Sequence, residues 1–189
     1  MSDILHQISF GLMALSALIA FGVAIERVIF TAVNMTRANH VLLHMASEPS
    51  GVESVLGQDA VSGMVQKIHH MQSLELSPEL RQDRIDAAFL HATDELKNRL
   101  WILDTVVTAA PLMGLLGTIF GIVDTFLIIS KSGISEPAAI SAGIGTALYA
   151  TAVGISIALT GLVAFNYLSD RVEKITERLK MIVLHLTHV

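Results

Sequence analysis

The sequence lacks cysteine altogether and has only four prolines among its 189 residues. Without cysteine the chain forms no disulfide and has no thiolate chemistry, and its redox compartment cannot be inferred. Charged residues make up 15% of the chain against 52% apolar residues, which is a high apolar share for a soluble domain of this length. The net charge of −5, with acids and bases intermixed, argues against a nucleic-acid surface, which needs a basic patch.

Charge is absent from three long segments, residues 7–25, 105–123 and 137–169. Each is long enough to cross a hydrocarbon core, which needs about 20 residues. Eleven of the twelve basic residues lie in residues 27–102 or in the C-terminal segment, and only Lys131 lies elsewhere. Because basic residues concentrate on the cytoplasmic side, we predict an all-α integral membrane protein with three transmembrane helices, N-terminus outside and C-terminus inside.

These spans divide the chain into four predicted parts. Residues 1–27 form an external tip and transmembrane helix 1, and residues 28–102 form a cytoplasmic helical region. Residues 103–169 form transmembrane helices 2 and 3 as a hairpin, and residues 170–189 form a cytoplasmic amphipathic helix. Trp101 lies where an interfacial aromatic residue is expected.

Proline and glycine indicate where the helices begin and end. The first helix is predicted from about residue 8 to residue 46, where Glu48-Pro49-Ser50-Gly51 stops it. A second helix is predicted over residues 52–72. Ser77-Pro78 predicts the start of a third, which we expect to continue without interruption to residue 129. Gly133 is the predicted turn residue of the short external connection between spans two and three.

Apolar residues at helical spacing indicate the buried faces of the cytoplasmic helices. The last of these stripes has near-heptad spacing among charged neighbours, and we expect a lone subunit to leave much of it exposed, which favours oligomerisation. The three stripes are Val61, Val65 and Ile68; Ile85, Phe89, Ala92, Leu96, Leu100 and Leu103; and Val172, Ile175, Leu179, Ile182 and Leu186.

Small and hydroxyl-bearing residues line one face of each of the last two spans. Small residues let helix backbones approach closely in lipid, so both faces are predicted packing seams. Span two contributes Ala110, Gly114, Thr118, Gly121 and Thr125, with Gly117 beside them, and span three contributes Ala147, Thr151, Gly154, Ala158 and Gly161.

Thr118 and Thr151 fall at matched depth in this hairpin, which raises a functional interpretation above simple packing. Two hydroxyls at one level can line a narrow polar passage or satisfy a buried polar group of a partner, although threonine also bonds to its own helix. Asp124 is the one acid well inside an apolar run, and it is either functional or close enough to the outer surface to be hydrated.

Other residues of the spans have structural interpretations. Pro111 removes a helical hydrogen bond from the carbonyl of Val107 and is predicted to kink span two. Glu26, Arg27 and Asp104 lie at the inner edges of their spans, where charge costs little.

The histidines do not indicate an enzyme or a metal site. His40 and His44 have a spacing of four residues that can hold zinc, but a zinc site needs three or four converging ligands, and no glutamate lies between them to act as a base. The sequence contains no phosphate-binding loop or nucleophile motif either. We therefore expect no enzymatic activity, no bound metal and no cofactor.

Residues 110–121, Ala-Pro-Leu-Met-Gly-Leu-Leu-Gly-Thr-Ile-Phe-Gly, resemble the signature of the ExbB/TolQ family of proton-channel subunits. Residues 145–154, Gly-Thr-Ala-Leu-Tyr-Ala-Thr-Ala-Val-Gly, resemble the second half of that signature. Ile25-Glu26-Arg27 is also typical of short members. The resemblance covers the whole topology, is specific in spans two and three, and is greatest to a short ExbB.

The resemblance implies a multi-pass subunit of a motor in the bacterial inner membrane. It implies a homo-oligomer, a pentamer, that encloses a dimer of a single-span ExbD- or TolR-like partner whose intramembrane aspartate carries the proton. Thr118 and Thr151 match threonines that face this aspartate and line the path. The proton motive force would then act through a TonB- or TolA-like protein, in the ExbB branch to drive TonB-dependent transport across the outer membrane.

The chain departs from the family pattern at Thr146, where several members have a glutamate. A proton-relay role for that glutamate therefore does not carry over, and Thr146 is retained only as a pore-lining residue. Asp124, where familiar members have an amide or histidine, is a tentative addition to the path. The chain has no other well-buried carboxylate, which points to a partner as the source of the proton-carrying group.

Other functions share parts of this pattern. A TolQ-like subunit of the Tol-Pal envelope-maintenance system has the same spans, so the sequence does not separate the two branches. A non-conducting helical scaffold would have the same topology but would not need both threonines. A flagellar stator subunit of the MotA type has four spans and a larger cytoplasmic part. A small autonomous channel would carry its own gate and selectivity charges.

Overall fold

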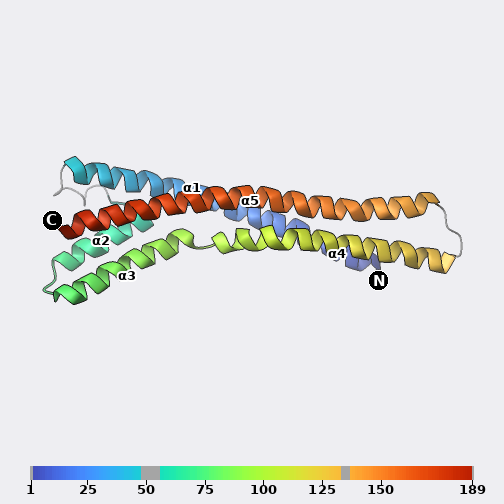
Figure 1. Cartoon of the computed structure of the whole chain (residues 1–189), viewed down its shortest axis with the longest axis horizontal. Coiled ribbons are helices and arrows are strands. Elements are labelled where there is room, and N and C mark those ends of the chain that lie inside the picture. Colours follow the sequence, from blue (N-terminus) through green and yellow to red (C-terminus); the bar gives the residue numbers. More distant parts are fainter. Residues whose placement is uncertain (1, 48–55, 133–136, 189) are drawn as a thin grey trace. The chain divides into compact units, whose positions relative to one another are not determined.

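The computed structural model describes residues 2–47, 56–132 and 137–188, and all regular secondary structure in them is helical (Figure 1). The helices are α1 (Ser2–Ser47), α2 (Ala60–Gln72), α3 (Pro78–Lys97), α4 (Leu100–Ser132) and α5 (Pro137–His188). In these residues three stretches are long and apolar enough to cross a membrane, within α1, within α3 and α4, and within α5. The predicted all-α fold with three spans is therefore confirmed, and the orientation in the membrane stays a prediction.

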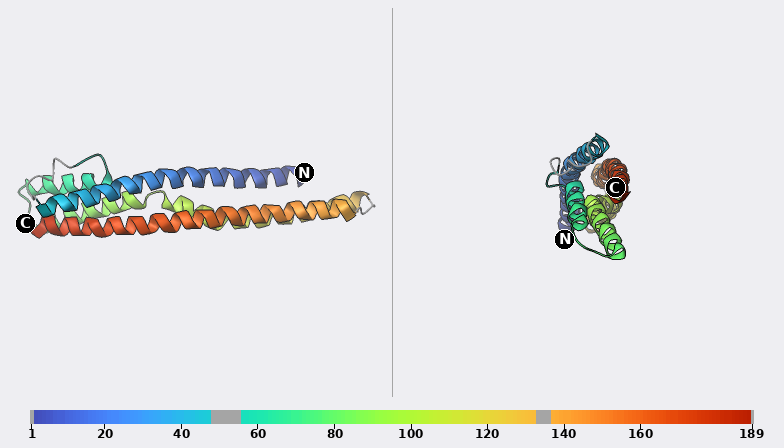
Figure 2. Two further views of the ribbon diagram at one scale, coloured as in Figure 1. Left: turned by 90° about the horizontal axis from the view of Figure 1, so that it is seen from above. Right: turned by 90° about the vertical axis from the view of Figure 1, so that its left-hand side faces the viewer.

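The chain forms two compact units, and α1, α4 and α5 contribute to both. Unit 1 comprises Met1–Ile25 and Trp101–Asn166, and unit 2 comprises Glu26–Leu100 and Tyr167–Val189. α5 is one helix from Pro137 to His188, and Figure 2 draws it as a single ribbon. Unit 1 contains the uncharged segments except residues 167–169, and unit 2 contains α2, α3 and most of the charged residues.

Unit 2 has an apolar core to which α1, α2, α3 and α5 all contribute. α2 packs against α3, and the residues predicted from helical spacing in these two helices are buried, except Phe89, which is half-buried. The fully or nearly fully buried side chains include Ala38, Val41, Ala60, Val61, Met64, Val65, Ile68, Ile85, Ala92, Leu96, Leu168, Val172, Ile175, Leu179 and Ile182.

The near-heptad stripe of α5 is already covered within one chain. Val172 is 3% exposed, and Ile175, Leu179 and Ile182 are fully buried. The expectation that a lone subunit would leave this stripe exposed is therefore wrong, because other segments of the same chain pack over it. This stripe is therefore not available for oligomerisation, which would use other surfaces of the chain.

Side-chain caps set where α2 and α3 begin. Asp59 accepts a hydrogen bond from the Ser62 amide at 3.0 Å, which satisfies one of the open donors at the start of α2. Ser77 accepts from the Leu80 amide at 3.3 Å, with Pro78 in the first helical position of α3 as predicted. The predicted start of α2 near residue 52 is wrong for residues 56–59, which are not helical; residues 52–55 lie outside the described part.

A break at Asn98 and Arg99 separates α3 from α4. Arg99 has a φ of 64°, the left-handed region that non-glycine residues rarely adopt, and Asn98 has an extended ψ of 142°. The expected uninterrupted helix over residues 78–129 is therefore wrong at this point. Past the break, α4 continues through Pro111 to Ser132, and the predicted kink at Pro111 stays a prediction. The predicted stop at Glu48–Gly51 and the turn at Gly133 lie outside the described residues.

Large apolar side chains point outward from all three spans in unit 1. They include Leu18 and Phe21 of α1, Leu112 and Phe126 of α4 and Tyr149 of α5, each more than 60% exposed. Exposed apolar surface of this extent needs a membrane or another protein to cover it. It agrees with the assignment of these helices as membrane spans.

Candidate functional site

α4 and α5 approach each other most closely at two glycines in unit 1. A Cβ atom on Gly154 would lie 2.5 Å from the carbonyl oxygen of Ala110 and 3.0 Å from the Cα atom of Gly114. A Cβ atom on Gly114 would lie 2.9 Å from the carbonyl oxygen of Ala150. These distances leave no room for a side chain, so backbone meets backbone along this seam, as small residues allow in membrane helices.

The hydroxyls of Thr118 and Thr151 meet at this seam. Their Oγ1 atoms are joined by a hydrogen bond, and both threonines are half-buried. The Gly114 carbonyl oxygen is an acceptor for both, at 3.2 Å from Thr118 Oγ1 and 3.1 Å from Thr151 Oγ1. Thr118 Oγ1 also lies 3.2 Å from the carbonyl oxygen of Ala147 on α5. The structure thus brings together the two threonines that the sequence placed at one depth.

The two hydroxyls have fewer protons than contacts. Each threonine has one O–H donor and two acceptor lone pairs, whereas the pair has four hydrogen-bond contacts, three to carbonyl oxygens and one between the hydroxyls. If Thr151 donates to Gly114, then Thr118 donates to Thr151; if Thr118 donates to Gly114 or to Ala147, then Thr151 donates to Thr118. The pair can therefore exchange donor and acceptor roles without losing its connection.

A second contact between α4 and α5 involves Thr125. Its hydroxyl donates to the carbonyl oxygen of Gly121 at 2.8 Å, and the side chain occupies the space that a Cβ atom on Gly143 would need. The residue spacing places Thr125 on the small-residue face of span two, but it gives Gly143 no role. The signal was present in the spacing, because Thr125 is seven residues, or two helical turns, beyond Thr118.

The other proposed pathway residues are separate from the threonine pair in their hydrogen bonding. Thr146 is exposed and donates to the carbonyl oxygen of Ala142 at 2.9 Å, a bond within α5 itself. Asp124 is half-buried on α4. The hydrogen bonds described for Thr118 and Thr151 do not reach either residue, so the geometry connects only the two threonines directly.

The remaining small residues of the two faces occupy the positions expected of contact residues. Gly117, Ala147 and Gly161 are buried and Gly121 is half-buried. A Cβ atom on Gly161 would lie 3.1 Å from Cγ2 of Val107, so this seam extends beyond the glycine pair.

The predicted membrane-edge charges differ in their surroundings. Asp104 is exposed, and Glu26 forms an ion pair with Arg99 at 2.6 Å. Arg27 is 4% exposed and lies over the ring of Phe30, with 4.8 Å between the guanidinium carbon and the ring centroid. A buried arginine was not expected at a position where charge should cost little.

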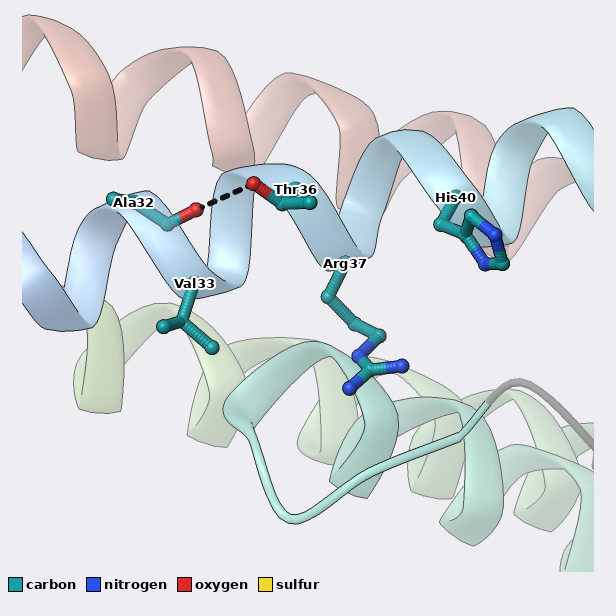
Figure 3. A pocket seen from close by; sticks show the side chains of 5 residues that line it. All are labelled: Ala32, Val33, Thr36, Arg37 and His40. Atoms are coloured by element: carbon teal, nitrogen blue, oxygen red, sulfur yellow. Dashed lines mark hydrogen bonds between the residues drawn. The ribbon is translucent and has the colours of Figure 1, made fainter.

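A shallow groove of about 460 Å³ lies along α1 in unit 2 (Figure 3). Ala32, Val33, Thr36, Arg37 and His40 line it. Figure 3 shows Arg37 reaching from α1 toward the residues before α2, where its Nε donates to Asp59 Oδ2 at 3.0 Å. The cation of this groove is therefore already engaged, and the hydroxyl of Thr36 donates to Ala32 of its own helix.

The histidines of α1 stack on each other. The rings of His40 and His44 have centroids 6.3 Å apart and are nearly parallel. Among the described residues no group of three or more histidine, aspartate or glutamate side chains converges in a way that could hold a metal ion.

Comparison with known proteins adds to this geometry. Residues 55–181 match the model of the MotA/TolQ/ExbB proton channel family, a range that includes all of α2, α3 and α4 and most of α5. This range contains the threonine pair and the glycine seam.

Curated relatives match shorter stretches. The biopolymer transport protein ExbB of Aquifex aeolicus is 44% identical over 85 residues, which cover 45% of this chain and 55% of the relative. The ExbB protein of Helicobacter pylori is 35% identical over 99 residues, 52% of this chain and 66% of the relative. The Tol-Pal system protein TolQ of Haemophilus influenzae is 37% identical over 84 residues, 44% of this chain and 37% of the relative.

The matched region spans only about a third to two thirds of the length of these relatives. The three apolar helices and the similarity to these relatives identify the chain as a multi-pass protein of the inner membrane. With a family model that covers most of its length, the chain belongs to the MotA/TolQ/ExbB proton channel family.

Proposed function

We propose that this chain is the proton-channel subunit of an ExbB-type motor, which couples the proton motive force to transport across the outer membrane. The observation that carries the proposal is the hydrogen-bonded pair of Thr118 and Thr151 at the close seam between α4 and α5. The pair is half-buried in the region that matches the family model.

The hydroxyl pair has the chemistry that a proton-carrying carboxyl group needs. A protonated carboxylic acid donates one hydrogen bond, whereas a carboxylate only accepts. Because the two threonines can exchange donor and acceptor roles, they can solvate either form. A charged carboxylate without such partners costs about 3 kcal/mol or more at mid-membrane, so the pair would ease the passage of the group between its two states.

The cycling carboxyl group comes from a partner in this proposal. Asp124 is the one acidic residue between residues 105 and 130, and it makes no described hydrogen bond with the threonine pair. We therefore propose a single-span partner of the ExbD or TolR kind with an intramembrane aspartate. Exposed apolar side chains of unit 1 give surfaces for a homo-oligomer, in the family a pentamer, around this partner.

The proposal fixes the remaining assignments. The N-terminus faces outward and the C-terminus inward, because this places the basic residues of unit 2 in the cytoplasm. A TonB-like protein transmits the energy. The ExbB branch rests on the 44% identity with the Aquifex aeolicus ExbB, whereas the Haemophilus influenzae TolQ at 37% is as similar as the Helicobacter pylori ExbB at 35%, so the TolQ branch is kept as the alternative.

Proton flux into liposomes tests the function. The chain is co-purified with its single-span partner and reconstituted, and flux is measured with a trapped pH dye under an imposed potential. Thr118→Val and Thr151→Val keep side-chain volume but remove a hydroxyl, and each is expected to lower flux at least about tenfold, because a hydrogen bond to a charged group contributes about 1.5–3 kcal/mol. Thr118→Ser should keep most of the flux.

A threonine that bonds only within its own helix is the matched control. Thr160 is exposed and donates to the carbonyl oxygen of Ser156 in α5 at 2.9 Å, so Thr160→Val should leave the flux unchanged. Assembled complexes in which both valine variants conduct normally would show that the threonines serve packing alone, and the scaffold alternative would then hold.

Asp124 and Thr146 are tested in the same assay. Asp124→Asn removes the carboxylate and keeps its shape, and a role on the path predicts reduced flux. Normal flux in this variant would remove Asp124 from the path. Thr146→Val is expected to have a smaller effect than Thr118→Val, because its hydroxyl is bonded within α5 and separate from the pair.

Copurification separates the two branches. A tagged chain that brings down an ExbD-like protein supports the ExbB branch, and one that brings down a TolR-like protein supports the Tol-Pal alternative.

Cysteine labelling tests the orientation. Because the chain has no cysteine, a single cysteine introduced at Ser2 or at Lys180 can be labelled with a reagent that does not cross the membrane. Labelling of position 180 from outside intact spheroplasts would reverse the proposed orientation.

A further inference from the structure

Two consecutive charged residues of α1 contact the break between α3 and α4. Glu26 pairs with Arg99, whose Nη1 lies 2.6 Å from both oxygens of the carboxylate. Arg27 Nη1 donates to the carbonyl oxygen of Glu95 in the last turn of α3 at 3.4 Å. All four residues belong to unit 2. α1 therefore contacts the last turn of α3 and the break itself, through residues 68 and 73 positions further along the chain.

The left-handed backbone conformation of Arg99 is not explained by the residues next to it in the sequence. Glycine is the usual residue at a left-handed position after a helix, because any Cβ atom is disfavoured there. Here the position with a φ of 64° is held by an arginine, and no proline or glycine lies between Leu96 and Leu100 to end the helix locally. The ion pair with Glu26 is the described contact that ties this residue to a neighbouring helix.

Arg27 contributes at the end of α3. The last carbonyl groups of a helix lack intrahelical partners, and a cation placed beside them is favoured by the helix dipole. Arg27 meets this requirement at Glu95, and its guanidinium also lies over the ring of Phe30. Its Nε is buried without a hydrogen-bond partner among the described residues. Packing and the end of α3 thus hold the side chain in a position where water does not compete.

We infer that Glu26 and Arg27 form a clasp that fixes the end of α3 and the start of α4, and that they are positioning residues for the hydroxyl site. Arg27 caps α3, and Glu26 holds Arg99 in the left-handed conformation that ends one helix and lets the next begin at Leu100. Because successive helical residues are rotated by about 100°, a shift of the start of α4 by one residue would change the rotation of every later position of that helix, Thr118 included. The expected effect of the clasp on proton conduction rests on the proposed function. The contacts that form the clasp do not depend on that function.

Amide hydrogen exchange tests the clasp on the purified complex. Glu26→Gln removes the charge of the partner of Arg99. Since the ion pair is half-exposed, with side-chain exposures of 51% and 47%, we expect amides of residues 103–106, the first in α4 with acceptors inside the helix, to exchange about two- to fivefold faster. Arg27→Met, which keeps apolar volume, should speed exchange in the last turn of α3 by a similar factor.

Variants at Arg99 separate the ion pair from the backbone conformation. Arg99→Lys keeps a cation that can reach Glu26 and should retain the slow exchange of the wild-type chain. Arg99→Gly suits the left-handed backbone but loses the ion pair, so exchange should be as fast as in Glu26→Gln. Slow exchange in Arg99→Gly would overturn the proposal, because the backbone alone would then hold the break.

A matched ion pair elsewhere provides the control. Lys174 and Asp170 pair at 2.7 Å within α5 with exposures of 50% and 55%, nearly those of the clasp. Asp170→Asn should leave exchange at residues 103–106 unchanged. If Asp170→Asn speeds exchange there as much as Glu26→Gln does, a general loss of surface charge pairs explains the result and the clasp is rejected.

Proton flux supplies the second readout. Glu26→Gln and Arg99→Gly should lower flux in assembled complexes, and Arg99→Lys should restore it, because the clasp acts by positioning α4. Faster exchange with unchanged flux would reject the positioning role and leave the proposed channel function intact. Normal flux in Thr118→Val and Thr151→Val, which leave the clasp unaltered, would instead reject the proposed function.

Discussion

Thr118 and Thr151, 33 residues apart in the sequence, join their hydroxyls across α4 and α5 and share the carbonyl oxygen of Gly114 as an acceptor. One backbone oxygen thus links both side chains to the seam where the helices are closest. The chemistry of the pair and the packing of the glycines are consequently parts of a single local structure.

The shared acceptor predicts that the two threonines are energetically coupled. Thr118→Val and Thr151→Val should each destabilise the α4–α5 pair by about 1 kcal/mol, the typical net value of a hydrogen bond. The double variant should cost about 0.5 kcal/mol or more less than the sum, because the mutual hydrogen bond is lost only once. Chemical unfolding in mild detergent measures the stability of the wild-type chain, the two single variants and the double variant. Strict additivity of the two losses would contradict the coupling.

The glycine contact predicts a steric effect of similar size. In Gly154→Ala the new methyl group meets the carbonyl oxygen of Ala110 at 2.5 Å, so α4 and α5 must separate at a cost of about 1–3 kcal/mol. Gly145→Ala is the matched control on α5, since a Cβ atom there has nothing within 4 Å. We expect only Gly154→Ala to lower the melting temperature of the purified complex, and equal effects would argue against a close seam.

The sequence was sufficient to predict the spans and the faces of the last two helices. Segments without charge identify the membrane helices because lipid excludes charge, and the four-residue spacing from Gly114 to Thr118 identifies a common face. Both signals are local in the chain. The spacing of Val172, Ile175 and Leu179 likewise identifies one apolar face of α5, although not the segments that cover it.

Contacts between distant segments limited the rest of the prediction. The break at Arg99 has no local signal, because the conformation of that residue is tied to Glu26, 73 residues earlier. Exposure of the α5 stripe was misjudged for the same reason, since its covering lies in other segments of the chain. Thr125 could be placed on a face of α4, but its contact with Gly143 depends on the register between α4 and α5, which the sequence does not fix.

That register gives a prediction at Thr125. The Thr125 side chain occupies the space beside the Cα atom of Gly143, so Gly143→Ala should destabilise the pair by about 1–3 kcal/mol. Thr125→Ala removes the hydroxyl and a methyl group and makes room. The double variant Gly143→Ala/Thr125→Ala should therefore recover most of the loss in thermal unfolding. If Thr125→Ala gives no rescue, the register of α4 against α5 differs from the one described.

The last prediction concerns the fully buried hydroxyl at the start of α2. Ser62 Oγ accepts a hydrogen bond from the Gly57 amide at 2.9 Å and donates to Asp59 Oδ2 at 2.9 Å, while the same carboxylate oxygen accepts from Arg37 on α1. Ser62→Ala removes a partner of the amide of half-buried Gly57 and one of the two described partners of Asp59 Oδ2.

A loss of this kind costs about 1–3 kcal/mol when the remaining groups stay buried. Ser73→Ala is the control, because the Ser73 hydroxyl is exposed and donates to the His70 carbonyl oxygen at 2.7 Å, so water can replace it. Limited proteolysis between α1 and α2 should become faster in Ser62→Ala and stay unchanged in Ser73→Ala. Equal cleavage rates in the two variants would mean that the cap does not hold this segment against α1, and that the apolar contacts of Val61 and Val65 alone dock the helix.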